Sequence, residues 1–492
     1  MNYLQKRYDL VVIGGGPAGT PVAIEYAKLN PKKSVALVET LGKLGGECLF
    51  QGCIPSKIMQ ASARYIDSIK ELKEFGIALD DTHYQLVWEK IVKRKESILE
   101  RRSVAAADVV EDLDNLTLIQ AKASFINENS IEIQSDDAKQ IVQFDRAVIG
   151  TGSRSFIPNY EGNGAKEIWT NSNFFAKMEL PKSLSIIGTG AIAIEFAQIL
   201  SEFGVKIYLF GRGEKILKNV EHEASEYLLE KLQANSNIEL LFKSDIQRVD
   251  FSDNAFTITY TQEGKQKELQ SHRVLSAAGR VANIDSLHLE KVGVKYTKKG
   301  ITTTNSLQTT NKNIYANGDV VEGFAKFAHT AQYGAHTIAQ NLFLEHNFFK
   351  IKPEINSWVL FSSPNVMMAG ITEKEAEEKG MEVLVDKFEF SGEAKSQIED
   401  EDYGYLKFIV EKSSNKIIGV SAMHQEAHTL GGEAALIVAN GLTLKDIIGS
   451  IHPHPTISEA YIMLAKQMMG SIMQETLQNP AIKTLLKLER WL

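Results

Sequence analysis

Short apolar runs that end at glycine-rich turns dominate the first two thirds of the chain. Residues 8–13 are apolar and rich in β-branched side chains, which is typical of a strand buried on both faces of a parallel sheet. A glycine-rich turn follows at 14–19, then a helical pattern over 20–29 and a second short strand over 34–38. Strand, glycine turn, helix and strand in this order predict a Rossmann-like α/β unit.

The glycine turn of this unit has the spacing of a dinucleotide-binding fingerprint. Gly14, Gly16 and Gly19 form G-x-G-x-x-G at the start of the predicted helix, where the backbone can approach a pyrophosphate closely. Glu39 follows the second strand and can accept a hydrogen bond from a ribose hydroxyl. Because the glycines occur together with both strands and the acid, they predict a dinucleotide site that suits an unmodified ribose.

A second fingerprint of the same kind follows the apolar run 185–187. Gly188 and Gly190 are its first two glycines, and Ala193 takes the third position. A helix and a partner strand over 205–210 complete the unit, so the chain is expected to hold two dinucleotide sites.

The two sites are not equivalent. Where the first unit has an acid, the second has Gly211, followed by Arg212 and then Lys218. Two cations without a carboxylate suit a 2′-phosphate, which slightly favours NADP over NAD. The alternative is that both cations are solvated surface charges.

The rest of the first 350 residues mixes helical and strand patterns. A helix-rich region over 56–112 precedes an alternating segment over 115–142, for which we expect a small antiparallel excursion. Further short strands and a final helix are predicted over 145–149, 270–280, 313–316 and 329–345. A domain boundary is expected at 158–164, where Gly, Asn and Pro cluster, and a linker at 351–356.

The pattern changes after residue 357, because strands and helices alternate there without a glycine fingerprint. Strands are predicted over 383–390, 406–410 and 417–423, and helices over 372–379 and 431–440. These segments predict an α+β domain. The final stretch, 460–492, is expected to be helical and to pack on its own domain.

Length and composition restrict the class of protein. A chain of 492 residues suggests about three domains. Its net charge of −8 argues against nucleic acid or an anionic membrane as the main partner. Two cysteines cannot form an extracellular disulfide framework, and neither a membrane span nor the apolar core of a signal peptide is predicted. We therefore expect a cytoplasmic protein.

The only two cysteines, Cys48 and Cys53, lie five positions apart within residues 45–57. Two turn glycines precede them, and a Pro-Ser-Lys helix start follows. Thiols at a helix N-terminus tend to have lowered pKa values, so this arrangement indicates a redox-active pair. The alternatives are half a metal site, which would need further ligands at ligand spacing, or two buried apolar thiols.

Two dinucleotide sites and one dithiol together specify an electron transfer. Nicotinamide gives electrons as hydride, a disulfide accepts a pair as two thiolates, and a flavin can mediate between them. We therefore assign FAD to the first unit and NAD or NADP to the second. Thiol exchange also needs an acid/base with a pKa near neutrality. His454, held between two prolines and five residues before Glu459, is the best candidate, and a structural loop histidine is the alternative.

With these motifs, the chain resembles the flavin-dependent pyridine nucleotide–disulfide oxidoreductases over residues 8 to about 465. The Gly-Cys-Ile-Pro-Ser-Lys ending of the thiol stretch is highly specific for that family. The His-Pro-His-Pro-Thr segment resembles the dihydrolipoamide dehydrogenase branch, whereas the cations after the second fingerprint resemble the NADPH-using glutathione reductase branch. Glu47 and Phe50 stand where the family usually has Thr and Asn. By this resemblance Glu47 would place a carboxylate near the FAD pyrophosphate, so it must point away or have a compensating partner.

The resemblance implies a role for each candidate residue. Cys48 would exchange with the substrate disulfide, and Cys53 would face the flavin. Lys57 would pair with Glu195 beside the flavin. The acid/base His454, supported by Glu459, would serve the thiols of the other subunit of a homodimer. The candidate cofactor contacts are Gly14, Gly16, Gly19, Glu39, Gly46, Lys57, Thr151, Gly152, Gly188, Gly190, Arg212, Lys218, Gly279, Arg280, Asp319 and Ala328. Among these, Asp319 would hold the ribityl chain and Ala328 would lie at the flavin ring edge.

The predicted fold is α/β, with two Rossmann-like dinucleotide-binding domains and a C-terminal α+β dimerisation domain. The predicted divisions are an FAD-binding domain at 1–155 that resumes at 276–350, an NAD(P)-binding domain at 156–275, a dimerisation domain at 351–465 and a helical tail at 466–492. The function we expect is that of dihydrolipoamide dehydrogenase, and a multienzyme complex is a further candidate partner. The alternatives are an NADPH-dependent reductase of another small disulfide and a redox-silent scaffold subunit.

Overall fold

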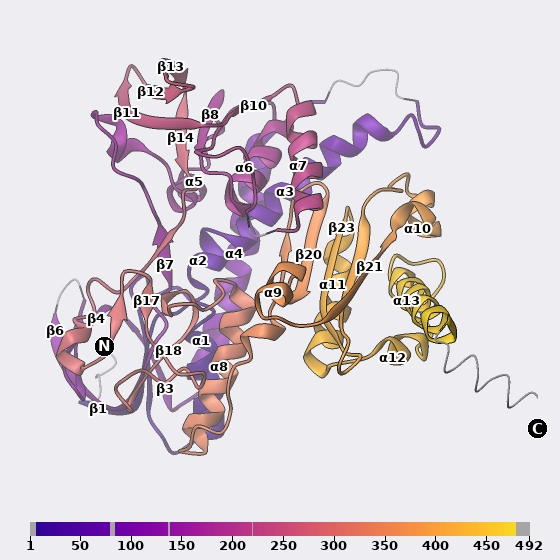
Figure 1. The fold of residues 1–492 in the computed structure, drawn as a ribbon. Helices are drawn as coiled ribbons and strands as arrows, with labels where there is room; N and C mark the ends of the chain where they lie inside the picture. The colour runs from indigo at the N-terminus through magenta and orange to yellow at the C-terminus, as the bar shows by residue number, and fades with distance from the viewer. Residues whose placement is uncertain (1–5, 79–83, 136–137, 219, 479–492) are drawn as a thin grey trace, which may run out of the picture. The chain divides into compact units, whose positions relative to one another are not determined.

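The computed structural model describes residues 6–78, 84–135, 138–218 and 220–478. They form two compact units, one within Met1–Lys218 and Lys231–Pro353, and the other within Asn219–Glu230 and Glu354–Leu492. The first unit holds two sheets built on parallel strands, and the second holds an antiparallel sheet (Figure 1).

The first sheet explains why the apolar runs near the N-terminus are continuous. Its parallel strands follow the order β3 (Leu116–Gln120), β2 (Val35–Glu39), β1 (Arg7–Ile13), β6 (Lys139–Ile149) and β18 (Ile314–Ala316). Helices α1 (Thr20–Leu29) and α8 (Ala328–Phe343) contribute apolar side chains to the same core. Consecutive residues such as Val11 and Val12 are both fully buried, so both faces of β1 are covered.

The segment 115–142 is only partly the antiparallel excursion that the sequence predicts. β4 (Lys122–Asn127) pairs antiparallel with β5 (Ser130–Gln134), which pairs antiparallel with the start of β6. β3, however, pairs parallel with β2 and belongs to the main sheet. As an edge strand, β3 has a mixture of buried and half-buried side chains, so its sequence alternates like that of an antiparallel strand.

The second sheet repeats the parallel arrangement. Its order is β10 (Ile238–Leu241), β9 (Lys206–Phe210), β8 (Ser183–Ile187) and β14 (Arg273–Ser276). Helix α6 (Ala191–Glu202) follows β8, as the second fingerprint predicts.

An antiparallel meander next to this sheet was not predicted. It consists of β11 (Ser244–Ser252), β12 (Ala255–Gln262) and β13 (Lys265–Ser271). Two-residue turns join the strands, Asp253–Asn254 and Glu263–Gly264, and all four residues have positive φ angles. Such turns are typical of tight hairpins, so these dipeptides between alternating segments were the signal available in the sequence.

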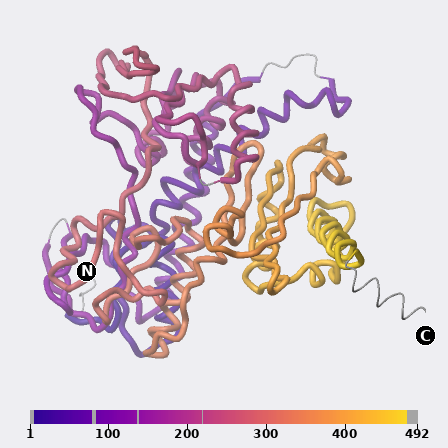
Figure 2. The backbone as a smooth tube through the Cα atoms, viewed as in Figure 1, coloured from indigo at the N-terminus to yellow at the C-terminus, as the bar shows by residue number. Residues whose placement is uncertain are grey.

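A two-stranded ribbon connects the two sheets. β7 (Ser153–Ser155) follows β6, and β15 (Arg280–Ala282) returns after β14. The two strands pair antiparallel, and the chain trace shows these distant segments side by side (Figure 2).

The second unit confirms the α+β prediction. Its sheet has the order β19 (Ser357–Leu360), β20 (Asn365–Gly370), β23 (Ile417–His424), β22 (Tyr405–Glu411) and β21 (Val383–Glu389). Helices α11 (Ala427–Asn440) and α13 (Glu459–Gln478) share its core. The predicted tail begins within α13, and its part after Gln478 lies outside the described residues. Among the helices that are described, none has both the length and the apolar character needed to cross a bilayer.

Candidate active site

The two cysteines lie on either side of a junction between helices. Cys48 is in the short helix α2 (Gly46–Phe50), and Cys53 is the first residue of α3 (Cys53–Glu71). Cys48 is half-buried, Cys53 is exposed, and both are free thiols. The structure therefore places Cys53 at the start of a long helix, as the Pro-Ser-Lys pattern indicates.

The thiol stretch is in direct contact with the first glycine fingerprint. The Gly45 N–H donates to the Gly15 carbonyl at 2.8 Å. A Cβ on Gly46 would lie 2.7 Å from the Gly16 Cα, and Gly46 has a φ of +56°. Only glycine permits such a close approach of two backbones, so this contact places the thiols beside the dinucleotide turn.

The two thiols differ in acidity. A hydrogen bond between them is the largest influence on both, and it lowers the pKa of Cys53 to about 7 while it raises the pKa of Cys48 above its ordinary value. The ammonium group of Lys57, one helical turn after Cys53, also lowers the pKa of Cys53. The shared proton therefore stays on Cys48, and the negative charge resides on Cys53.

Lys57 also pairs with a residue that is distant in the sequence. Its Nζ lies 2.7 Å from Oε2 of Glu195, which is on α6. The Glu195 side chain is only 14% exposed. The structure thus brings the two predicted partners together and joins α3, next to the thiols, to the second dinucleotide unit.

The first fingerprint forms a cradle that fits a dinucleotide such as FAD. A Cβ on Gly14 would lie 2.4 Å from the Gly150 carbonyl oxygen, so the ends of two strands meet there without side chains. The Thr20 N–H at the start of α1 donates to the Gly16 carbonyl oxygen at 3.0 Å, and Gly19 caps the helix without a side-chain hydrogen bond, so the glycine turn packs closely on the helix N-terminus, the end that favours a phosphate. Glu39 accepts from the Gly15 N–H at 2.6 Å, so its carboxylate points at the turn.

Asp319 and the ribbon lie close to this cradle. Gly318 packs against Ala18, because a Cβ on Gly318 would lie 2.8 Å from the Ala18 Cβ. Asp319 accepts from the Ser153 hydroxyl at 2.6 Å and lies 3.6 Å from Nε of Arg280.

The other predicted flavin contacts lie at element ends. Thr151 and Gly152 follow β6, and the Thr151 hydroxyl donates to the Asn283 carbonyl at 2.8 Å. Gly279 immediately precedes β15, and Ala328 is the first residue of α8.

The first glycine of the second fingerprint makes the same kind of close backbone contact as that of the first fingerprint. A Cβ on Gly188 would lie 2.5 Å from the Ala277 carbonyl oxygen, which matches the contact of the first glycine in the other unit. Gly190 caps α6 without a side-chain hydrogen bond, and a Cβ on it would meet nothing within 4 Å. The N-terminus of α6 therefore also has room for a phosphate.

The two cradles differ at the ribose position. By the register of each sheet, Gly211 follows β9 at the place where Glu39 ends β2. A Cβ on Gly211 would lie 2.8 Å from Cγ2 of Thr189 and 2.9 Å from the Phe242 ring. An acidic side chain would therefore need its surroundings to move, which agrees with the sequence-based contrast between the units.

Arg212 and Lys218 flank an anchored loop. The Leu217 N–H donates to the Thr189 carbonyl at 2.9 Å, and both Ile216 and Leu217 are buried. Both cations are exposed, so the loop holds two charged side chains in solvent next to the second glycine turn.

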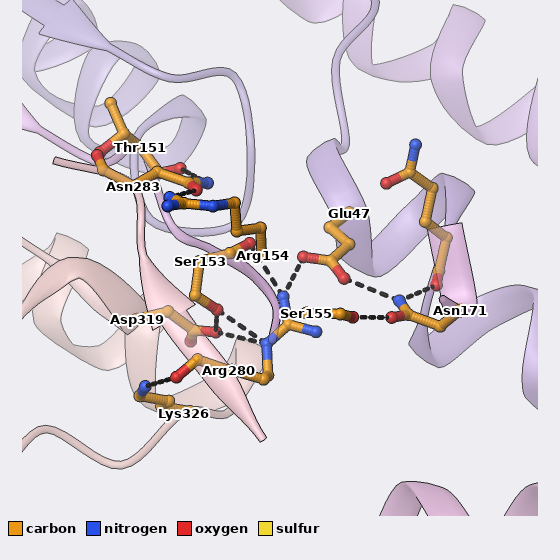
Figure 3. A network of polar contacts seen from close by, with 11 residues as sticks. Glu47, Thr151, Ser153, Arg154, Ser155, Asn171, Arg280, Asn283, Asp319 and Lys326 are labelled. Atoms are coloured by element: carbon orange, nitrogen blue, oxygen red, sulfur yellow. Dashed lines mark hydrogen bonds and ion pairs between the residues drawn. The ribbon is translucent and has the colours of Figure 1, made fainter. Parts of the chain in front are cut away.

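A second network was only half anticipated from the sequence. Glu47 forms an ion pair with Arg280, which supplies the positive partner for the carboxylate that replaces the usual threonine (Figure 3). Asn171 donates to the other Glu47 oxygen at 2.7 Å, and Arg280 donates to the Ser153 hydroxyl at 2.7 Å. Nothing in the local sequence indicates Asn171, because it lies 124 positions from Glu47.

In the second compact unit, which contains Glu354–Leu492, His454 and Glu459 are adjacent. Nδ1 of His454 lies 3.0 Å from Oε2 of Glu459, which is the first residue of α13. The His454 side chain is 71% exposed. Sequence reasoning missed a second pair of this kind, in which Nε2 of the largely buried His452 lies 2.9 Å from Oε1 of Glu433 on α11. In the part of the chain that the structure describes, no cluster of three or more His, Cys, Asp or Glu could hold a metal ion.

Two dinucleotide folds, with a dithiol packed on the first fingerprint, define the class of the protein as a flavoprotein disulfide oxidoreductase. The chain belongs to the pyridine nucleotide-disulphide oxidoreductase family, whose model matches residues 8–335, and the dimerisation domain of that family matches residues 356–465.

Curated relatives of the chain include dihydrolipoyl dehydrogenases. The chain is 30% identical over 468 residues to that of Bacillus subtilis (strain 168), with 94% of this chain and 97% of the relative covered. It is 31% identical to that of Buchnera aphidicola subsp. Schizaphis graminum (strain Sg), with 94% and 96% covered. Among solved structures, the Cu(II) complex of the HOCl-induced flavoprotein disulfide reductase RclA from Escherichia coli has a similar fold. Its TM-score is 0.81 at 23% identity, with 94% of this chain and 100% of that chain covered.

Proposed function

We propose that this protein is a dihydrolipoamide dehydrogenase, in which the Cys48–Cys53 pair passes electrons between a small dithiol and a pyridine nucleotide through FAD. The observation that carries the proposal is the contact between residues 45–51, the thiol turn, and the first fingerprint. The opposite pKa shifts of the two thiols support it. The dihydrolipoyl dehydrogenase relatives and the His-Pro-His-Pro segment favour this substrate.

FAD, when bound, supplies a flavin that accepts and gives an electron pair. The residues that we propose to hold it are Gly14, Gly16, Gly19, Glu39, Gly46, Lys57, Thr151, Gly152, Gly279, Arg280, Asp319 and Ala328. The FAD-binding domain would then comprise 1–155 and 276–350, the nucleotide domain 156–275 and the dimerisation domain 351–465.

The thiol chemistry follows from the asymmetry of the pair. His454 removes a proton from one substrate thiol, and the resulting thiolate attacks Cys48 in the Cys48–Cys53 disulfide. Cys53 leaves as the thiolate that its lowered pKa stabilises. The second substrate thiol then attacks the substrate sulfur that is bound to Cys48. Cys48 leaves and takes up the proton of that second thiol, and the substrate disulfide is released. His454 holds the other proton with the support of Glu459.

His454 lies in the region that matches the family's dimerisation domain. We propose a homodimer in which His454 of each subunit serves the thiols of the other. This arrangement would account for an exposed acid/base residue in a domain without a cofactor fingerprint.

A panel of lipoamide, dihydrolipoamide and glutathione disulfide, each with NAD(H) and NADP(H), tests the substrate. We expect turnover with the lipoamide couple and little with glutathione disulfide. Turnover restricted to glutathione disulfide would refute the lipoamide proposal and favour a reductase of another small disulfide.

The choice between NAD and NADP depends on the second dinucleotide site. NADP is favoured there by the two cations, Arg212 and Lys218, and by Gly211, which stands where the first site has an acid. Arg212→Ala is expected to raise the KM for NADP(H) about tenfold or more, because a charge-assisted contact to the 2′-phosphate is lost, and to leave NAD(H) unaffected. Arg248→Ala removes an exposed arginine of the same proposed nucleotide domain and serves as the control. Equal losses with both nucleotides would contradict the role of Arg212.

A further inference from the structure

The turn that carries Cys48 depends on contacts from outside it. α2 has only five residues, and its N-cap, Gly45, offers no side chain to hydrogen-bond the first turn. A helix of this length is unstable on its own. The position of Cys48 relative to Cys53 is therefore set by the residues that hold α2 in place.

Asn171 holds both ends of this turn. Its side-chain Nδ2 donates to Oε1 of Glu47 at 2.7 Å and to the carbonyl oxygen of Gln51 at 2.6 Å. Glu47 is in the first turn of α2, and Gln51 is its C-cap residue. A side-chain amide has two N–H bonds, and Asn171 uses both of them on the thiol turn (Figure 3).

Asn171 is itself fixed in position. It is the first residue of α5 (Asn171–Lys177) and is 5% exposed. The Ser155 hydroxyl, on the ribbon between the two sheets, donates to its Oδ1. Arg280, on the other strand of that ribbon, holds the second carboxylate oxygen of Glu47. The thiol turn is thus held by the buried Asn171 of α5 and by the half-buried Arg280 of the ribbon.

We propose that Asn171 is a positioning residue for the redox pair. Asn171 keeps Cys48 at the distance and orientation at which Cys48 forms a disulfide with Cys53. This inference rests on the proposed redox role of the two thiols. Without the two hydrogen bonds the thiols would remain reactive but would meet less often. The disulfide would then be less favoured relative to the dithiol.

Equilibration of the full-length, FAD-containing protein with reduced and oxidised glutathione tests this role. One S–S bond forms between Cys48 and Cys53, the S–S bond of glutathione disulfide breaks, and its two sulfurs leave as two glutathione thiols. Acid quenching, alkylation and mass spectrometry give the fraction of disulfide without any turnover. Asn171→Leu keeps the size of the side chain and removes both donors. It is expected to shift the equilibrium about tenfold toward the dithiol, or about 30 mV for a two-electron couple.

Asn115→Leu is the matched control. The Asn115 side chain donates to the carbonyl oxygens of Ala27, Asn30 and Lys33, a comparable clamp in the same unit that does not involve the thiol turn. The Asn115→Leu variant is expected to lose thermal stability as Asn171→Leu does. Its equilibrium between the Cys48–Cys53 disulfide and the dithiol should stay that of the wild type. Asn171→Ser, a smaller change, is expected to shift the equilibrium in the same direction and covers the case in which the leucine variant does not fold.

The outcomes separate this proposal from the proposed function. A wild-type protein that forms no Cys48–Cys53 disulfide at any glutathione ratio would refute the redox function itself. A normal wild-type equilibrium that is unchanged in both Asn171 variants would overturn only the positioning role. An equal shift in Asn115→Leu would also overturn it, because loss of stability alone would then explain the effect.

Discussion

At the scale of single residues, the acidity of Cys53 depends on what its neighbour donates. The Cys48 thiol is the largest cause of the lowered pKa, ahead of the Lys57 charge in the same direction. In Cys48→Ala this donor is lost, so the pKa of Cys53 is expected to rise from about 7 toward the ordinary value of about 8.5. Because the thiolate forms above the pKa, its fraction at pH 7 should fall from about half to a few per cent.

The rate of iodoacetamide alkylation against pH measures this change directly. Each single-cysteine variant contains no other cysteine, so the rate reports on Cys53 alone. Cys48→Ser keeps a hydroxyl donor and is expected to retain most of the lowered pKa. The same pH profile in the Ala and Ser variants would contradict the role of the hydrogen bond.

At the scale of elements, the contact between the thiol turn and the first fingerprint leaves no room for a side chain at Gly46. Gly46→Ala places a methyl group 2.7 Å from the backbone of Gly16 and forces alanine into a φ of +56°. The strain is expected to cost about 1–3 kcal/mol and to lower both the urea midpoint and the flavin content.

Gly470→Ala is the control for this substitution. Gly470 lies within α13, and a Cβ on it would meet nothing within 4 Å. Alanine there is expected to be neutral or to stabilise by up to about 1 kcal/mol. If Gly46→Ala and Gly470→Ala have the same urea midpoint and the same flavin content, the close backbone contact at Gly46 is not needed.

At the scale of the whole molecule, the proposed dimer requires an apolar surface on the second unit. Helix α11 buries Leu430, Ala434 and Ile437 in its own core, yet Leu436 is 64% exposed. Leu436→Arg is expected to place a charge in the subunit interface and to shift the protein to monomers in sedimentation analysis. Flavin reduction by the nucleotide should persist, while disulfide turnover should fall.

Ile141→Arg makes the same kind of change at a residue that is 60% exposed on β6, outside the dimerisation domain. It is expected to leave the oligomeric state unchanged. A Leu436→Arg protein that sediments like Ile141→Arg would contradict this interface.

Much of the site could be predicted because its parts are local in sequence. The fingerprints, the thiol stretch and the His454–Glu459 pair each lie within about 30 residues. Their spacing indicates the kind of chemistry to expect, while the role of each residue is what the family resemblance implies. Contacts between distant segments left weaker signals. Glu47 called for a positive partner, but only the folded ribbon places Arg280 and Asn171 beside it. Likewise, His452 finds Glu433 only because the loop before α13 returns to α11.

The presence of only two cysteines gives the chain a practical use in finding its own partner. In Cys53→Ser, Cys48 can still attack a substrate disulfide, and one substrate sulfur leaves as a thiol. When the two sulfurs of the substrate belong to separate molecules after cleavage, as in glutathione disulfide, the other sulfur stays bound to Cys48, because no second cysteine in the chain can release it. Such a variant would act as a covalent bait, and the mass added to it would report the identity of the disulfide that the protein meets in its native cell.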